Sequence, residues 1–203
     1  MNKIILLTVL FISSVIMAAA QVRSPEDLQN EKIYTSLEEA LLEPENVFRF
    51  KLKKCKKCDS IPEEIFQLYN LQELNISGLK IKKLNVNISK LARLQFLNVS
   101  NNQLKGLPES IGQLKELKSL IINRNKIETL PITIANLHKL TMVDAWDNPL
   151  YTLPKEIEQI SNNLRVLDLR QIPLKERELE EMEQLLPLTN ILFTSVCECN
   201  DER

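Results

Sequence analysis

"LQFLNVSNNQLKGLPESIGQLKE", residues 94–116, decides the fold, because the chain repeats its spacing on both sides. The stretches before and after it read "LQELNISGLKIKKLNVNISKLAR" and "LKSLIINRNKIETLPITIANLHK", and a slightly longer version begins at residue 140. Their common pattern is L-x-x-L-x-L-x-x-N-x-L-x-x-L-P-x-x-I-x-x-L-x-x. A period of about 20 to 50 residues predicts a solenoid, in which each repeat packs on its neighbours.

The columns of this pattern have physical reasons. Apolar residues at repeat positions 4 and 6, such as Leu97 and Val99, share one face of a short strand, so that stacked repeats form one continuous core. The asparagine column is expected to turn the chain and to bond loop backbone groups that are buried between repeats. A proline then stiffens the return path. Beyond it, an isoleucine column predicts short helical segments on the convex side: Ile65, Ile88, Ile111, Ile134 and Ile157.

Weaker copies of the repeat extend the array in both directions. One begins at Val47 and another at Leu164, and the second half of the latter, "KERELEEMEQLLP", has the apolar spacing of a helix. In the final strand, "LTNILFTSV", the residues that align with the core columns are Leu188, Ile191 and Phe193. The sequence therefore predicts an α/β solenoid of about six repeats over residues 47–187, closed by a capping strand and tail over residues 188–203.

The first residues have the features of a secretory signal peptide. Lys3 is followed by an apolar run that ends near Ile16, and small residues stand at Ala18 and Ala20. The run is shorter than the roughly 20 residues that span a bilayer. Residues 1–20 are therefore predicted to be a signal peptide, with an uncleaved anchor or an internal helix as the alternative. We expect an exported protein, either secreted, periplasmic or at the cell surface, without a membrane span in the mature chain.

Residues 21–46 are predicted to form a helical cap, because the open end of a solenoid would expose its core. Ser24 followed by Pro25 is typical of a helix start. Ser36 and Glu39 have the spacing of a capping box ahead of a second short helix.

Several segments resemble a known family. "LKGLPESIGQLKELKSL" and "IETLPITIANLHKL" resemble the LxxLPxxIxxLxxL class of leucine-rich repeats, which occurs in plant intracellular Ras-group-related proteins, Ras-pathway scaffolds and many bacterial proteins. The ends of the array, "YTSLEEALLEPENVFRFKL" and "LPLTNILFTSVCECN", are similar to those of small secreted leucine-rich repeat proteins of Bacteroidetes-type bacteria. The resemblance implies a curved solenoid with parallel strands on the concave face and short helical or irregular convex segments. It also implies a binding module without enzymatic activity, and leaves the ligand open.

The concave face supplies the predicted binding site. Repeat positions 3, 5, 7 and 8 should face outward there, and in the middle repeats they combine large apolar residues with polar and charged ones. Tryptophan and arginine are frequent interface anchors. We predict partner binding through Phe96, Asn98, Ile121, Arg124, Met142, Asp144, Trp146, Asp168 and Arg170. The alternative is that these side chains cover one another or are scattered surface residues.

The net charge and the residue content argue against nucleic-acid binding and against catalysis. A formal net charge of -1 provides no chain-wide basic field for nucleic acid. The single histidine, His138, falls at the end of a convex segment, so a serine or cysteine nucleophile would lack a histidine base. Asp144 and Asp168 occupy equivalent positions on adjacent strands, but Arg124 and Arg170 nearby indicate a charge-balanced surface. We therefore predict no enzyme activity, cofactor or metal.

Three functions remain open for the predicted face. The first is protein binding by a monomeric module, the second is binding of a carbohydrate or cell-envelope glycan, and the third is a structural or adhesive role without a discrete hot spot. A local basic cluster could attract an anion, but lysines at a sheet end also discourage pairing with another chain, and we favour that interpretation. The cluster comprises Arg49, Lys51, Lys53, Lys54, Lys56 and Lys57.

The cysteines fit the repeat. Cys55 occupies the asparagine column and Cys58 the apolar position after it. Cys197 and Cys199 lie about six strand spacings away, or nearly 30 Å at roughly 4.8 Å each. Zinc–sulfur bonds are only about 2.3 Å long, so a four-cysteine zinc site within one chain is excluded. Disulfides between Cys55 and Cys58, or between Cys197 and Cys199, stay open.

Overall fold

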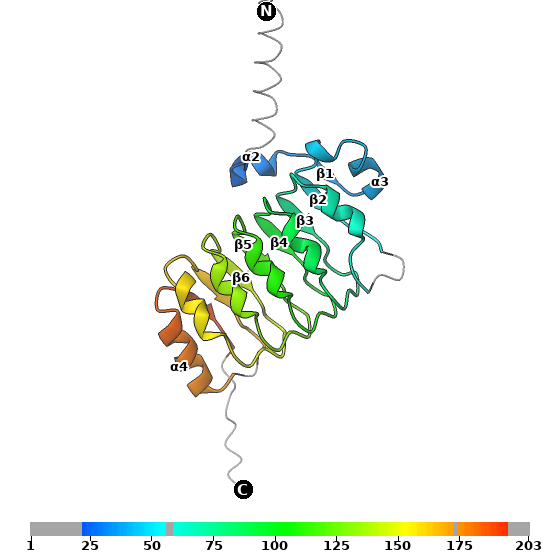
Figure 1. Cartoon of the computed structure of the whole chain (residues 1–203). Coiled ribbons are helices and arrows are strands. Elements are labelled where there is room, and N and C mark those ends of the chain that lie inside the picture. Colours follow the sequence, from blue (N-terminus) through cyan, green and yellow to red (C-terminus); the bar gives the residue numbers. More distant parts are fainter. Residues whose placement is uncertain (1–21, 56–58, 173, 195–203) are drawn as a thin grey trace, which may run out of the picture.

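The computed structural model describes residues 22–55, 59–172 and 174–194. Within these ranges the strands form one open parallel sheet, in which each strand pairs with the next along the chain (Figure 1). This order confirms the predicted solenoid. The predicted signal peptide lies outside the described residues. The strands are β1 (Ile33–Tyr34), β2 (Arg49–Lys51), β3 (Glu73–Asn75), β4 (Phe96–Asn98), β5 (Ser119–Ile121), β6 (Met142–Asp144), β7 (Val166–Asp168) and β8 (Asn190–Leu192).

Short 3-10 helices return the chain behind the sheet. Four of them follow a proline in extended conformation, whereas η3 follows Asn85, whose side chain accepts a hydrogen bond of 2.8 Å from the backbone N–H of Asn87. The isoleucine that each contributes to the core is fully buried, as the sequence pattern predicted. These helices are η2 (Glu63–Gln67), η3 (Val86–Lys90), η4 (Glu109–Gln113), η5 (Ile132–Asn136) and η6 (Lys155–Ile160).

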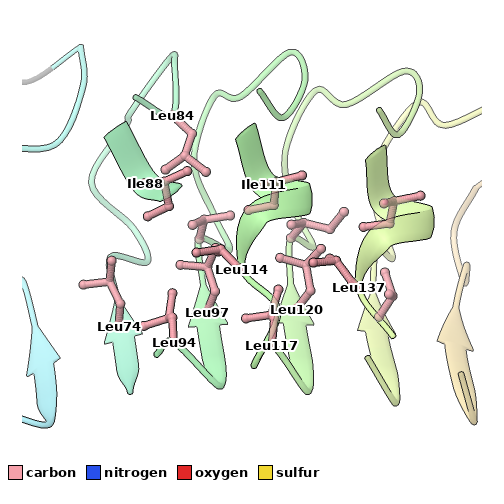
Figure 2. Close-up of a cluster of buried hydrophobic side chains, with 14 of the residues drawn as sticks. Leu74, Leu84, Ile88, Leu94, Leu97, Ile111, Leu114, Leu117, Leu120 and Leu137 are labelled. Atoms are coloured by element: carbon pink, nitrogen blue, oxygen red, sulfur yellow. The ribbon is translucent and has the colours of Figure 1, made fainter. Parts of the chain in front are cut away.

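The core lies between the sheet and the 3-10 helices. Figure 2 shows Leu74, Leu97 and Leu120 in the same place on successive strands, with Ile88 and Ile111 facing them from the helices. All five side chains are at most 1% exposed. Burial of each such side chain contributes about 1.5–3 kcal/mol. The core is therefore a continuous row that runs from repeat to repeat.

The asparagine column joins neighbouring repeats as predicted. Nδ2 of Asn125 donates to the backbone oxygens of Val99 at 3.0 Å, Ile122 at 2.8 Å and Asn123 at 3.1 Å. Its Oδ1 accepts from the backbone N–H of Leu104 at 3.0 Å. Val99 and Leu104 belong to the preceding repeat, so one amide satisfies backbone groups of two repeats. Similar bonds are made by Asn102 and Asn148.

The amino-terminal region contains α2 (Pro25–Gln29), α3 (Leu37–Ala40) and η1 (Pro44–Asn46). The predicted helix starts are confirmed, because Ser24 Oγ accepts from the N–H of Asp27 at 3.1 Å and Ser36 Oγ accepts from the N–H of Glu39 at 3.2 Å. The sequence prediction missed β1, which pairs Ile33 with Arg49 and so adds a strand to the sheet.

At the other end, the predicted helix is confirmed as α4 (Glu176–Leu185), which buries Met182. Strand β8 follows in register, with Ile191 opposite Leu167. The prediction that Leu188 and Phe193 join the core is wrong, since they are 59% and 44% exposed. The reason is that no further strand covers β8 within the described part of the chain.

Cys55 takes part in a disulfide bond. Cys58, Cys197 and Cys199 lie outside the described residues, so the pairing stays a prediction. Lys56 and Lys57 of the basic cluster also lie outside them.

The asparagine column should carry a large share of the stability. Replacing Asn125 with alanine leaves buried backbone groups of two repeats without partners, and we expect a loss of about 2–4 kcal/mol in the free energy of unfolding. Urea denaturation followed by circular dichroism measures it. Asn136→Ala, at an exposed position of η5, is the control and should change stability by less than about 0.5 kcal/mol. Equal losses in the two variants would contradict this role.

Close packing of η4 on η5 requires glycine at position 112. A Cβ atom there would lie 2.4 Å from the backbone oxygen of Thr133, whereas a Cβ at Gly106 would meet nothing within 4 Å. We expect Gly112→Ala to lower the free energy of unfolding by about 1–3 kcal/mol. Gly106→Ala should leave it unchanged or raise it by up to about 1 kcal/mol. Thermal melts compare the stability of the two variants. If neighbouring repeats can shift apart to make room for the methyl group, Gly112→Ala will be as stable as Gly106→Ala, and the prediction fails.

Candidate functional site

The exposed face of the sheet is built by strand alternation. In β4 and β6 the middle residue is buried and its two neighbours are half-buried, so Phe96, Asn98, Met142 and Asp144 all point away from the core. Ile121 continues this row on β5. The regular register places these side chains on one surface, with Asn98 opposite Ile121 and Ile121 opposite Asp144.

The amino-terminal segment covers one part of this surface, a feature that the sequence analysis missed. The backbone N–H of Arg23 donates to Gln72 Oε1 at 2.8 Å, and Gln95 Nε2 donates to the backbone oxygen of Arg23 at 2.8 Å. The Arg23 guanidinium also lies 3.9 Å from the centre of the Phe48 ring. Leu28 of α2 is only 1% exposed. Residues 22–29 are thereby fixed against the sheet and do not merely cover its first strand.

A sequence signal for this contact existed. Gln72 and Gln95 occupy the second position of consecutive repeats, where the following repeats have Lys118, Thr141 and Arg165. Both glutamines are fully buried, and buried polar side chains need partners. The partners come from a distant part of the sequence, so the repeat pattern alone does not reveal them.

Between α2 and the sheet lies a cavity of about 250 Å³, here called the α2 pocket. Pro25 and Leu28 line it from α2, and Phe96 and Ile121 line it from the strands. Its polar edge contains Arg49, Glu73, Asn75, Asn98 and Ser119. Three of the nine predicted site residues, Phe96, Asn98 and Ile121, are therefore brought together in one pocket.

Arg49 is one of the charged residues that line the α2 pocket. Its Nε donates to Glu73 Oε2 at 2.7 Å, and its Nη1 donates to the backbone oxygen of Gln29 at 2.8 Å. The guanidinium thus links the first full repeat, the second repeat and the end of α2. Its charge is balanced by Glu73, so this member of the predicted basic cluster has its own acidic partner.

Trp146 and Arg124 form a second group on this face. The Arg124 guanidinium lies 4.5 Å from the centre of the Trp146 ring, which is a cation–π distance. Arg124 itself has a left-handed backbone with φ of 52°, and its Nε lies 3.9 Å from Asp147 Oδ2. Arg124 is exposed and Trp146 is half-buried. Part of the aromatic surface is therefore covered by an exposed arginine side chain, which also lies beside Asp147.

Asp144 and Asp168 lie opposite each other on β6 and β7, as predicted. Asp168 forms a two-pronged ion pair with Arg170, with Nη2 to Oδ2 at 2.6 Å and Nε to Oδ1 at 2.9 Å. Asp144 Oδ2 accepts from Asn123 Nδ2 at 2.6 Å, while its Oδ1 has no hydrogen-bond partner within the described residues. The predicted charge balance is right for Arg170, whereas Arg124 pairs with Asp147 instead.

The two carboxyl groups differ in pKa. Burial raises the pKa of Asp144, the Asn123 hydrogen bond opposes this, and the charge of Asp168 adds to the rise. The Trp146 backbone and the charge of Arg170 lower the pKa and offset part of the rise. Burial also acts to raise the pKa of Asp168, but the hydrogen bonds and charge of Arg170 outweigh it and hold that pKa below its usual value. Asp144 is therefore the carboxylate with the less favourable surroundings.

The remaining predicted residue, Met142, is half-buried on β6 opposite Ser119. A second hollow of about 420 Å³ lies between η6 and α4, and none of the nine predicted residues lines it. His138 is exposed. No group of three or more histidine, cysteine or acidic residues within residues 22–55, 59–172 and 174–194 is placed to hold a metal ion. No helix in those ranges is long and apolar enough to span a membrane.

The pKa difference gives a test of this site. Asp144→Asn keeps an oxygen that can accept the hydrogen bond from Asn123. It removes a carboxyl group that the fold favours in its protonated, uncharged form. We expect it to raise the free energy of unfolding at pH 7 by less than about 1 kcal/mol, because solvent screens the charge of a half-buried group. The difference from the parent should shrink as pH falls through the raised pKa of Asp144 toward the ordinary aspartate value of about 3.9.

Asp168→Asn is the matched control with the opposite sign. Because the pKa of Asp168 is lowered, its ionised form stabilises the fold above the ordinary aspartate pKa, and this stabilisation is lost as pH falls through the lowered value. The variant should therefore be less stable than the parent at pH 7. Melting curves between pH 3 and pH 7 measure the stability of both variants. A loss of stability at pH 7 in Asp144→Asn as well as in Asp168→Asn would show that ionised Asp144 stabilises the fold, contrary to this prediction.

Solved structures with the same architecture come from bacteria and plants. A leucine-rich repeat protein of Leptospira interrogans is 29% identical to this chain, with a TM-score of 0.65. The match covers 82% of this chain and 49% of the Leptospira protein. The plant peptide hormone receptor RGFR1, in complex with RGF2, is 25% identical with a TM-score of 0.56, covering 71% and 23% respectively. Internalin C2 of Listeria monocytogenes shares the fold at 20% identity and a TM-score of 0.59, covering 73% and 62%. The chain thus spans less than two thirds of each of these proteins.

A search of the curated proteins gives no significant match. The family model described as a leucine-rich repeat region, in contrast, matches residues 86–202, which is more than half of the chain. The match agrees with the parallel strand order and with the asparagine column. The chain therefore belongs to the leucine-rich repeat family.

Proposed function

We propose that the chain is a non-enzymatic module that binds a protein partner through the exposed face of its sheet. The observation that carries the proposal is a row of half-buried apolar side chains on this face. Phe96, Ile121, Met142 and Trp146 come from three consecutive repeats and lie among polar and charged groups. Partly exposed large apolar residues beside arginine are typical of interface anchors.

The family supports this class of function. Leucine-rich repeat proteins are typically binding scaffolds without enzymatic activity, and the similar plant receptor was solved in complex with RGF2. The carboxylates on the face also favour binding, since Asp168 is committed to Arg170 and the described residues bring no histidine next to Asp144.

The site of action that we propose is the cell envelope or the exterior. The support is the signal-peptide pattern of residues 1–20, together with similarity to a plant receptor and an internalin. A monomer is the simplest form of such a module, because the curved face then stays open to a partner.

A glycan partner is the second candidate, because Trp146 with polar neighbours could form a sugar platform. Sugars stack on an open aromatic face, but the Arg124 guanidinium lies 4.5 Å from the Trp146 ring centre. This contact favours a protein partner over a glycan. A structural or adhesive role is the third candidate and predicts no discrete hot spot.

Removing the apolar anchors tests the proposal. The double variant Trp146→Ala with Phe96→Ser should reduce capture of the partner from a source-organism envelope extract at least tenfold, since anchor residues contribute more than about 1.4 kcal/mol. Captured proteins are identified by mass spectrometry, and the same preparations are applied to a glycan array. Because both side chains are only half-buried, the melting temperature should fall by no more than a few degrees.

Ile132→Ser is the matched control, because Ile132 is an apolar residue of η5 that is 57% exposed on the other side of the repeat. It should leave capture unchanged. Undiminished capture by the double variant would refute binding through this face, and loss of glycan signals alone would favour the carbohydrate alternative.

A further inference from the structure

The α2 pocket has the size of a subsite for one side chain. Its volume of about 250 Å³ lies below the range of about 300–1,000 Å³ that is usual for small-molecule pockets. Its walls, Leu28 and Pro25 on one side and Phe96 and Ile121 on the other, are apolar. Such a pocket suits a single apolar side chain of a protein, which is the kind of anchor that dominates interface energetics.

The pocket is preformed. The backbone of Arg23 is bonded to Gln72 and Gln95, both fully buried, and Arg49 bonds the backbone oxygen at the end of α2. These contacts hold the α2 wall in place before any partner arrives. A preformed wall removes part of the entropy that binding otherwise loses.

Next to the pocket lies the carboxylate of Asp144, which forms no ion pair of its own within the described residues. Asp144 Oδ2 accepts a hydrogen bond from the neutral amide of Asn123, and its Oδ1 is buried without a hydrogen-bond partner within the described residues. An ionised carboxylate offers about four acceptor sites. The nearby guanidinium of Arg170 is committed to Asp168, and that of Arg124 to Trp146 and Asp147. Two carboxylates, Asp144 and Asp168, thus share one cation, which leaves one negative charge that a basic group would complement.

The spacing of the two features matches a peptide. Ile121 lines the pocket and is the register partner of Asp144 on the next strand. The pocket extends from β2 to β5, and its apolar strand wall, Phe96 and Ile121, lies on β4 and β5. The midpoint of this wall is therefore about one and a half strand spacings from Asp144 on β6, or roughly 7 Å. Alternate residues of an extended chain point to the same side and are roughly 6.6 Å apart.

Resting on the proposed function, we infer that the partner presents an extended segment that runs across the strands. An apolar side chain enters the α2 pocket, and a lysine or arginine two residues away bonds Asp144. The order of the two residues along the partner depends on the direction in which its chain runs, so both orders are included. The recognised element is a spaced pair of residues.

A peptide display experiment tests this inference. Random linear decapeptides displayed on phage are selected on the purified full chain and on variants, and the enriched sequences are compared. The parent should enrich an apolar residue and a lysine or arginine separated by one position. Asp144→Asn should lose the basic preference and keep the apolar one, while Ile121→Asn should do the reverse. If Ile121→Asn does not fold, Ile121→Thr replaces it.

Glu128→Gln, which removes an exposed acid outside this face, is the charge control and should keep both preferences. A synthetic peptide with the enriched pair should bind Asp144→Asn at least tenfold more weakly than the parent in calorimetry. A basic preference that survives Asp144→Asn would overturn the inference, as would selection of no peptide or of peptides without the pair.

These failures are distinguishable from failure of the proposed function. If selected peptides lack the pair but their binding is lost in the Trp146→Ala with Phe96→Ser variant, the face binds proteins by other contacts and only the inference falls. If the double variant retains both peptide binding and envelope capture, the proposed binding face itself is wrong.

Discussion

The amide of the ladder asparagine is the interaction on which the rest of the structure depends. Where each strand ends, the chain turns outward between two repeats, and the turn leaves backbone groups that water cannot reach. Asn125 satisfies such groups in its own repeat through Ile122 and in the preceding repeat through Val99 and Leu104. A buried unpaired backbone group would destabilise the fold by about 1–3 kcal/mol. The same bonds hold neighbouring repeats in register.

The register between strands determines which side chains of successive repeats lie together on the exposed face of the sheet. When strand ends are held level, side chains at equivalent repeat positions lie side by side, as Ile121 and Asp144 do on β5 and β6. The face then combines two environments. Toward the amino terminus α2 lies over the strands and borders the α2 pocket. Toward the carboxyl terminus Asp144 is half-buried, and the buried Asp168 is paired with the exposed Arg170.

The chemistry of this face suits the proposed binding of a partner. The ion pair of Asp168 with Arg170 and the stacking of Arg124 on Trp146 both fix side chains in place, which lowers the entropy lost when a partner binds. Asp144 differs from them, since it is held beside the sheet with only a neutral donor. A surface of this kind combines rigid apolar contacts with one position of unmet charge. Such a combination favours selectivity among partners as well as affinity.

The sequence by itself determined the solenoid, its strand order, the convex isoleucine column and the asparagine ladder, because all of these follow from contacts between repeats at a constant spacing. It also placed the outward-facing residues on one surface, since strand alternation is local. Only the tertiary structure decided where residues 22–29 lie and that Leu188 and Phe193 remain exposed. Those outcomes depend on contacts between segments of different sequence, or on the lack of a following strand. A period carries no information about such contacts.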